Sequence, residues 1–289
     1  MMSSRELIDS HQHLWVMSER TYDWIEPEYG VLYDDFTPER LEPEIAPSGV
    51  TGSVLVQAAD TYEDTFYMLE VAHHSKFVKG VVGFIPLDRP AEAIRALKVF
   101  SKDKYLKGVR NLTHNYADAK YESDDAWILR PKVLETLAAV EEAGLAFDYV
   151  AVNEAHLANV ASLADKFPKL KIVIDHFAKP NIASQVMEPW ASQMADLAKF
   201  ENVYGKFSGL NTASKSDWSV ADWQPYVDHM VHSFGAHRIM MGGDWPVITL
   251  MNNYVDIWNA QVACTEKYSE RDQEWIRSKT AIEVYELEG

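Results

Sequence analysis

The chain has 289 residues, 47% of them hydrophobic, which is enough to bury a sizeable core and within the range in which an α/β barrel forms one domain. Its 44 acidic and 27 basic residues give a formal charge of -17, which argues against nucleic acid and anionic membranes as partners. The single cysteine, Cys264, excludes an internal disulfide and a thiolate metal site. A small-molecule substrate is the partner that remains. The oligomeric state stays open, with a homo-oligomer as one outcome.

Short β-branched runs recur along the chain, and most of them are separated by segments in which apolar residues have helical spacing. The eight expected strands cover residues 7–15, 52–57, 78–86, 106–110, 145–150, 170–175, 202–207 and 237–241. The expected helices include residues 61–75, 91–101, 131–143, 154–167, 189–199 and 220–234. This alternation predicts the α/β class and a (β/α)8 TIM barrel. No linker, repeat or low-complexity run divides the chain, so we expect a single domain over residues 1–289.

Two further observations concern the cellular location of the protein and the segment before the second expected strand. No apolar run approaches about 20 residues, and residues 1–6 lack the apolar segment of a signal peptide, so we expect a cytoplasmic protein without a membrane partner. The long aromatic stretch 15–47 interrupts the alternation before the second strand, and we expect it to fold over the barrel mouth.

The first expected strand carries His11 and His13. Alternate residues of a strand face the same side, so the two imidazoles can converge on one point. Such a pair can bind a divalent metal, or polarise a carbonyl group without a metal. Taken alone, the pattern is equally consistent with two surface histidines.

Other polar side chains also fall where strands end, which in a TIM barrel is where the active site is built. Left unpaired in a core, such groups would each cost several kcal/mol, so we expect them to face a charge-balanced cleft. They are Gln57, Arg110, Asn111, Asp148, Asp175, His176, Lys206, Ser208 and Asp244.

Three segments, residues 11–13, 174–180 and 241–246, together resemble the amidohydrolase superfamily (amidohydrolase family 2). The resemblance is to its lactonase branch, which includes fuconolactonases, rhamnonolactonases, sulfomuconolactonases and pyrone-dicarboxylate lactonase. It extends to residues 107–110 and 206–210 and covers nearly the whole chain.

The resemblance implies that Asp244 is the general base and that His11, His13 and His176 surround the substrate carbonyl or a metal. It implies at most one divalent ion, with zinc expected, on His11, His13, His176 and Asp244, and the branch also includes metal-independent enzymes. Strand four offers Arg110 and strand five Asp148, so the ligands of a second metal are lacking. Alternative roles are a turn residue for Asp244 and a core histidine for His176.

Arg110 is the candidate for holding a carboxylate or lactone oxygen, because its planar fork donates two parallel hydrogen bonds. A surface salt bridge is the alternative. Trp24 and Trp245 could stack on the apolar face of a sugar ring, although core packing is the usual role of tryptophan. The remaining candidates for substrate binding are Gln57, Asp148 and Ser208.

The resemblance implies a hydrolase of carbohydrate catabolism that opens a sugar-acid (aldono-) lactone by attack of an Asp-activated water. Lactone opening needs an activated water, an electrophilic helper and a proton for the leaving alkoxide, and a carboxylate among imidazoles can supply these. Alternatives are a zinc-dependent decarboxylase of the same superfamily, a lactone isomerase and a barrel that only binds carbohydrate. The chain has neither a phosphate-binding glycine loop nor a serine nucleophile elbow.

Overall fold

The computed structural model describes residues 6–112 and 125–288. Eight strands form one sheet in the order β1 to β8, and every neighbouring pair is parallel. The ring is closed between β1 and the chain after β8, where the His13 amide donates to the Trp245 carbonyl at 2.7 Å and the Asp244 amide to the His11 carbonyl at 2.7 Å. The predicted (β/α)8 TIM barrel is therefore confirmed, while the single-domain boundary 1–289 stays a prediction. The strands are β1 (Ile8–Gln12), β2 (Gly52–Val56), β3 (Val78–Gly83), β4 (Leu106–Asn111), β5 (Ala146–Tyr149), β6 (Ile172–Ile174), β7 (Val203–Phe207) and β8 (Ile239–Met241).

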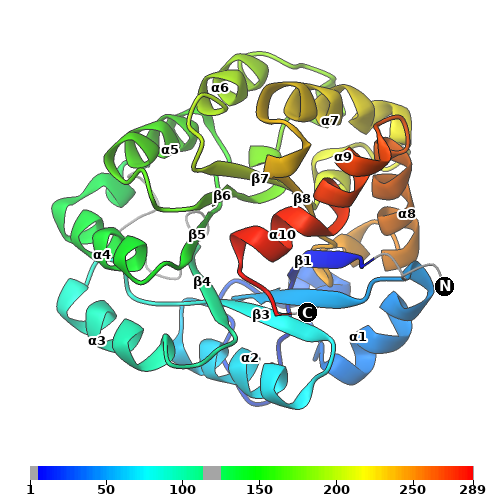
Figure 1. The fold of residues 1–289 in the computed structure, drawn as a ribbon. Helices are drawn as coiled ribbons and strands as arrows, with labels where there is room; N and C mark the ends of the chain where they lie inside the picture. Colours follow the sequence, from blue (N-terminus) through cyan, green and yellow to red (C-terminus); the bar gives the residue numbers. More distant parts are fainter. Residues whose placement is uncertain (1–5, 113–124, 289) are drawn as a thin grey trace.

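Helices surround this ring, as Figure 1 shows. Side-chain caps fix two of their starts: the Thr61 hydroxyl accepts from the Asp64 amide at 3.2 Å, and the Asn153 side chain accepts from the His156 amide at 2.8 Å. The six expected helices are found with ends shifted by at most two residues, and the helix predicted at 220–234 has these bounds in the structure. The α-helices are α1 (Pro38–Ile45), α2 (Tyr62–His74), α3 (Pro90–Phe100), α4 (Pro131–Glu142), α5 (Glu154–Lys166), α6 (Trp190–Leu197), α7 (Val220–Phe234), α8 (Tyr254–Thr265), α9 (Glu270–Glu274) and α10 (Thr280–Val284). Shorter helical turns are η1 (Pro27–Leu32), η2 (Ala46–Ser48), η4 (Trp127–Leu129), η5 (Asp175–Ala178), η6 (Ile182–Ser184), η7 (Leu210–Ala213), η8 (Ala236–Arg238), η9 (Val247–Leu250) and η10 (Trp275–Lys279).

None of the helices in the described part of the chain is both long and apolar enough to cross a bilayer. The expectation that residues 1–6 are not part of a signal peptide concerns mainly residues 1–5, which lie outside the described part of the chain.

The interior of the barrel is apolar at one end. Inward-facing side chains of the strands form a separate buried cluster with the C-terminal segment, and α10 runs across this end of the ring in Figure 1. Because this end is plugged, the inward-facing polar side chains gather toward the carboxyl ends of the strands. The cluster comprises Ile8, Val54, Val56, Val82, Ala146, Val173, Met240, Ala281, Val284, Tyr285 and Leu287.

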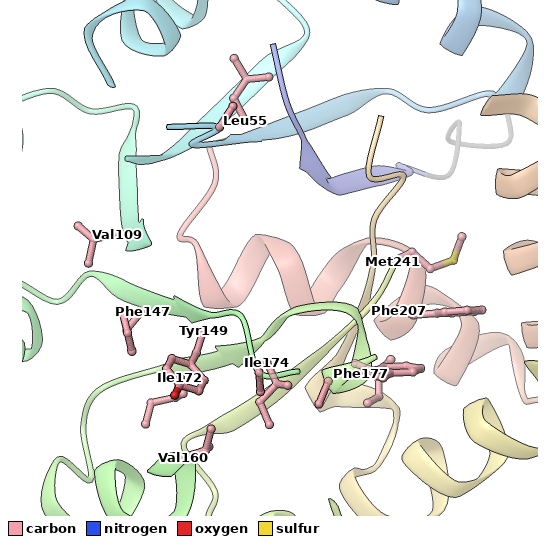
Figure 2. Close-up of a cluster of buried hydrophobic side chains, with 14 of the residues drawn as sticks. Leu55, Val109, Phe147, Tyr149, Val160, Ile172, Ile174, Phe177, Phe207 and Met241 are labelled. Atoms are coloured by element: carbon pink, nitrogen blue, oxygen red, sulfur yellow. The ribbon is translucent and has the colours of Figure 1, made fainter. Parts of the chain in front are cut away.

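A second apolar layer lies between the strands and the helices. Figure 2 shows part of it, where Phe147 and Tyr149 of β5 and Ile172 and Ile174 of β6 lie near Val160 of α5. Asp148 and Val173 alternate with these outward-facing residues along β5 and β6, so their side chains point into the barrel.

Seven of the eight expected strands begin or end inside their predicted bounds, and only the strand predicted at 106–110 does not. The strand predicted at 7–15 ends at Gln12, so His13 follows it. Strand 170–175 ends at Ile174, because the chain enters a left-handed turn at His176 (φ 53°) that continues through Lys179 (φ 47°). Strand 78–86 ends at Gly83, and strand 237–241 begins at Ile239 because His237 lies in η8.

Candidate active site

Four of the predicted residues meet at the carboxyl ends of the strands. His13 Nε2 lies 3.1 Å from His11 Nε2 and 3.4 Å from Asp244 Oδ1. His11 Nε2 lies 3.7 Å from the same oxygen, and His176 Nδ1 lies 3.9 Å from Asp244 Oδ2. All four residues are buried, with at most 6% of each residue exposed. The structure thus brings one carboxylate and three imidazoles together.

Local backbone geometry explains how Asp244 reaches the histidines. It has φ 58°, a left-handed conformation that aspartate tolerates better than most residues. Two glycines provide room: a Cβ on Gly242 would lie 2.7 Å from His11 Cβ, and a Cβ on Gly209 (φ 59°) would lie 2.7 Å from Asp244 Oδ2. A side chain at either position would displace His11 or Asp244.

The electrostatics favour neutral imidazoles at His11 and His176 beside an ionised Asp244 carboxylate. Burial lowers the pKa of His176 to about 4 and, together with the charge of Lys206, holds the pKa of His11 well below its usual range. Burial raises the pKa of Asp244, but contacts with His176 and His13 outweigh this and hold it below its ordinary value. At neutral pH Asp244 can therefore accept a proton.

A second set of buried charged groups lies beneath His11. The Lys206 ammonium donates to Asp148 Oδ2 in a short contact and lies 3.3 Å from Asp175 Oδ1, while Arg110 Nη1 donates to Asp175 Oδ2 at 3.0 Å. Tyr285 of the C-terminal segment donates its hydroxyl to Asp148 at 2.9 Å. Two cations thus face two carboxylates, which offsets the cost of burying each charge.

The two carboxylates of this set differ in their pKa. Burial, joined by repulsion from Asp175, raises the pKa of Asp148 to about 6 despite the attraction of Lys206. Burial acts on Asp175 too, but Lys206, His11 and Arg110 surround it and hold its pKa well below the usual range. Asp175 is therefore the more firmly ionised of the pair.

A cavity of about 220 Å³ opens above Asp244. Among the predicted residues, His13, Trp24, Arg110, His176 and Asp244 line it. The stretch 15–47, which we expected to fold over the barrel mouth, contributes Trp24, Tyr29 and Leu32 to this lining. The other lining residues are Ala58, Leu112, Val150, Lys179, Thr212, Val247 and Leu250.

Four predicted substrate-binding residues do not appear in this lining. Trp245 is fully buried, packs against Phe36 and donates to Glu44, because the chain turns it away after Asp244. Asp148 lies beneath the cavity with Lys206 and Tyr285. The other two support cavity residues: Gln57 accepts from Arg110 through its carbonyl, and Ser208 Oγ lies 2.8 Å from His176 Nδ1.

The site also contains three residues for which the motifs predict no role. Lys206 stood at a predicted strand end without a role, and Lys179 lies in the segment 174–180 that carries the resemblance. Tyr285 has no sequence signal, because its contact with Asp148 joins residues 137 positions apart.

The donor set fits one metal ion. His13 Nδ1 lies 2.8 Å from the Val56 carbonyl, which can only accept a hydrogen bond, so Nε2 is the ring nitrogen that remains to bind a metal beside His11 and Asp244. The donor separations of 3.1, 3.4 and 3.7 Å bracket the spacing of about 3.3 Å expected for tetrahedral zinc with Zn–N bonds of about 2.0 Å. His176 also lies in this group, its ligand atom within 4.8 Å of those of His11 and Asp244.

The described residues contain one other group of metal-type ligands, His11, Asp148 and Asp175. Lys206 Nζ already lies among them, 3.1 Å from His11 Nδ1 and in contact with both carboxylates. A lysine ammonium thus takes the place that a second cation would need.

Comparison with known proteins agrees with this geometry. Residues 8–287 match the family described as Amidohydrolase. An L-fucono-1,5-lactonase of Burkholderia ambifaria is 38% identical over 267 residues, covering 91% of this chain and 88% of the relative. An L-fucono-1,5-lactonase of Burkholderia multivorans is 29% identical, covering 86% and 85%. The crystal structure of a Burkholderia multivorans amidohydrolase with bound zinc superposes with a TM-score of 0.87 at 26% identity, covering 98% of this chain and all of that one. The chain belongs to the amidohydrolase family, as its motifs predicted.

Proposed function

We propose that this protein is a lactonase that hydrolyses a sugar-acid lactone, with L-fucono-1,5-lactone as the first substrate to test. The observation that carries the proposal is the ionised Asp244 carboxylate at the cavity floor, in contact with His11, His13 and His176. The similarity to two proteins named L-fucono-1,5-lactonase supports this substrate class.

In the proposed reaction Asp244 takes a proton from a water molecule as the water oxygen adds to the lactone carbonyl. An imidazole N–H of the histidine group donates to the carbonyl oxygen as negative charge develops there. Asp244 then passes its proton to the ring oxygen as the C–O bond of the ring breaks. The product is a hydroxy acid, whose carboxyl group releases a proton to solvent at neutral pH.

A divalent ion, with zinc as the expected species, would be held by His11, His13, His176 and Asp244 and would polarise the carbonyl group. Ser208 acts through His176, with or without a bound metal ion. Ser208 orients the His176 ring through its contact at 2.8 Å. Ser208 is therefore a positioning residue for His176, which lines the cavity.

The cavity walls suit a small sugar ring with polar groups on one side. Trp24 and Tyr29 form a T-shaped pair with ring centroids 5.9 Å apart, and apolar side chains complete that part of the wall. Aromatic faces of this kind pack against the C–H face of a sugar. Arg110 and Lys179 supply positive charge for a lactone oxygen or for the carboxylate of the product.

A pH-indicator assay on a panel of sugar-acid and muconate-type lactones tests the proposal, with the enzyme metal-stripped and then restored with Zn²⁺. We expect acid release on an aldonolactone that is lost in the Asp244→Asn variant. Acid release from none of the lactones would refute the proposal. Carbon dioxide release from an unsaturated acid would favour the decarboxylase instead, and a product of unchanged mass would favour an isomerase.

A further inference from the structure

Asp244 lies in a left-handed segment of the backbone that needs support. Its φ is 58°, and such a conformation at a residue other than glycine persists only where surrounding contacts fix it. Two bonds fix the chain at and after Asp244: its own amide donates to the His11 carbonyl and the His13 amide to the Trp245 carbonyl, both at 2.7 Å. The peptide before Asp244, at Gly243, needs a partner of its own.

Asp9 of β1 is that partner. The Gly243 amide donates to Asp9 Oδ1 at 2.7 Å, and the His11 amide donates to the same oxygen at 3.0 Å. Gly243 directly precedes Asp244, and His11 carries one of the imidazoles that face the Asp244 carboxylate. One carboxylate oxygen therefore ties together the two strand ends that carry catalytic groups.

The second oxygen of Asp9 is held by two side chains. The Tyr254 hydroxyl at the start of α8 donates to Oδ2 at 2.6 Å, and Gln12 Nε2 donates to it at 2.8 Å. Asp9 and Tyr254 are both buried, and neither is among the residues that line the cavity. With two donors on each oxygen, the carboxylate cannot rotate without losing hydrogen bonds, so Asp9 is a rigid support and not a substrate contact.

The glycine at position 243 allows this support to approach the backbone. A Cβ there would clash with Asp9 Oδ2 and would lie 2.5 Å from Tyr254 Cε2. The carboxylate and the phenol ring therefore pack directly against the peptide that precedes Asp244. A displacement of either group would reach the Asp244 backbone through this contact.

We propose that Asp9 is a positioning residue for the catalytic carboxylate of Asp244, and that Tyr254 and Gln12 hold Asp9 in place. Asp9 Oδ1 fixes the Gly243 peptide and thereby the direction in which the Asp244 side chain leaves the backbone. A catalytic group must be held within about 0.5 Å of its productive position, and a buried hydrogen bond next to it in the chain does this. The catalytic consequence rests on the proposed function, because it acts through Asp244, whereas the hydrogen-bonding role does not depend on the substrate.

Alanine and asparagine at position 9 separate the loss of the acceptor from the loss of the charge. Asp9→Ala removes both oxygens, whereas the carbonyl oxygen in Asp9→Asn can take the place of Oδ1 and keep the amides of Gly243 and His11. The new amide nitrogen then faces two groups that can adapt, because the Tyr254 hydroxyl can accept and the Gln12 amide can turn its oxygen toward it. Asp9→Asn is therefore the conservative variant that should rescue the positioning.

Steady-state hydrolysis of the best lactone tests the effect on Asp244. We expect Asp9→Ala to lower kcat at least about tenfold with KM within about threefold of wild type, because a small displacement of a reacting group has effects of this scale or larger. Asp9→Asn should return kcat to within about threefold of wild type. A folded Asp9→Ala protein with kcat within about threefold of wild type would overturn the proposal, and so would an Asp9→Asn protein no more active than Asp9→Ala.

Asp64→Ala is the matched control. Asp64 is also buried and accepts from two backbone amides, those of Ala58 at 2.8 Å and Ala59 at 3.3 Å, but these follow β2 and not β8. Its loss should lower the thermal midpoint as the loss of Asp9 does, while kcat stays within about threefold of wild type. A fall in kcat equal to that of Asp9→Ala would show that any lost buried carboxylate lowers activity, and would refute a specific role for Asp9.

Amide hydrogen exchange, followed by NMR of ¹⁵N-labelled protein without substrate, tests the support separately from the reaction. The Gly243 amide should exchange slowly in wild type, at a similar rate in Asp9→Asn, and at least about tenfold faster in Asp9→Ala. If Asp9→Ala does not fold, Tyr254→Phe takes its place, because it keeps the ring and removes one donor to Asp9; exchange at Gly243 should then rise at least about threefold. Unchanged exchange at Gly243 in the variant that folds would overturn the proposal, whether or not the protein hydrolyses a lactone.

Discussion

Replacement of Asp244 by asparagine should abolish most of the activity while leaving the fold intact. Asparagine has the same shape, tolerates the left-handed backbone at φ 58°, and its amide can donate to the His13 Nε2 lone pair 3.4 Å from the present Oδ1. It cannot accept a proton from water. The expected loss in kcat is at least about a hundredfold, the scale typical of a general base and equal to about 2.7 kcal/mol of barrier.

The assay is steady-state hydrolysis of the best lactone, followed by pH-stat titration, with the thermal midpoint and circular dichroism measured on the same samples. Asp228→Asn is the matched control, because Asp228 lies on α7, pairs with Lys267 at 2.7 Å and is not among the cavity residues. It should keep kcat within about twofold, as surface changes usually do. A folded Asp244→Asn protein with kcat within about tenfold of wild type would remove Asp244 from the mechanism.

Three further outcomes are expected. Arg110→Lys and Arg110→Ala should both lower kcat/KM at least about thirtyfold, because lysine keeps the charge without the planar fork and alanine removes both. A lower thermal midpoint for Arg110→Ala with kcat/KM within about twofold of wild type would limit Arg110 to its ion pair with Asp175. Elemental analysis should find no more than one divalent ion per chain, because Lys206 lies among the other ligands, and two tightly held ions would contradict this. Burial lowers the pKa of His176 to about 4. The value of kcat/KM should therefore stay level from about pH 8 to pH 6 and fall only as the pH approaches 4, where the ring takes up a proton. A fall of kcat/KM centred near about pH 6.5 would instead indicate a histidine with an ordinary pKa.

The sequence predicted those features that depend on short-range patterns. Strand periodicity predicted that His11 and His13 converge; the structure brings them together although β1 ends at Gln12 and His13 follows it. The order of the strands predicted that Asp244 lies beside them. The helical pattern over residues 61–75 predicted a helix that the structure shows at Tyr62–His74. These features need only neighbouring residues and the regular geometry of a barrel.

Other features depend on packing between distant segments, which periodicity does not report. Tyr285 reaches Asp148 only because the C-terminal segment plugs the barrel, and Trp245 turns into the core against Phe36. The left-handed turn after Ile174 also lacks a glycine signal at His176, so the predicted end of this strand, Asp175, lies one residue too late. Such tertiary contacts decide which strand-end residues line the cavity.

The central claim is that water adds to the carbonyl of a lactone in this cavity. Reaction of L-fucono-1,5-lactone in H₂¹⁸O, under conditions where the uncatalysed rate is negligible, tests it by mass spectrometry of the product. The account predicts a hydroxy acid heavier than the lactone by one labelled water, with the ¹⁸O in its carboxylate, and no such product from Asp244→Asn. A product with the mass of the substrate, or one that has lost carbon dioxide, would contradict it.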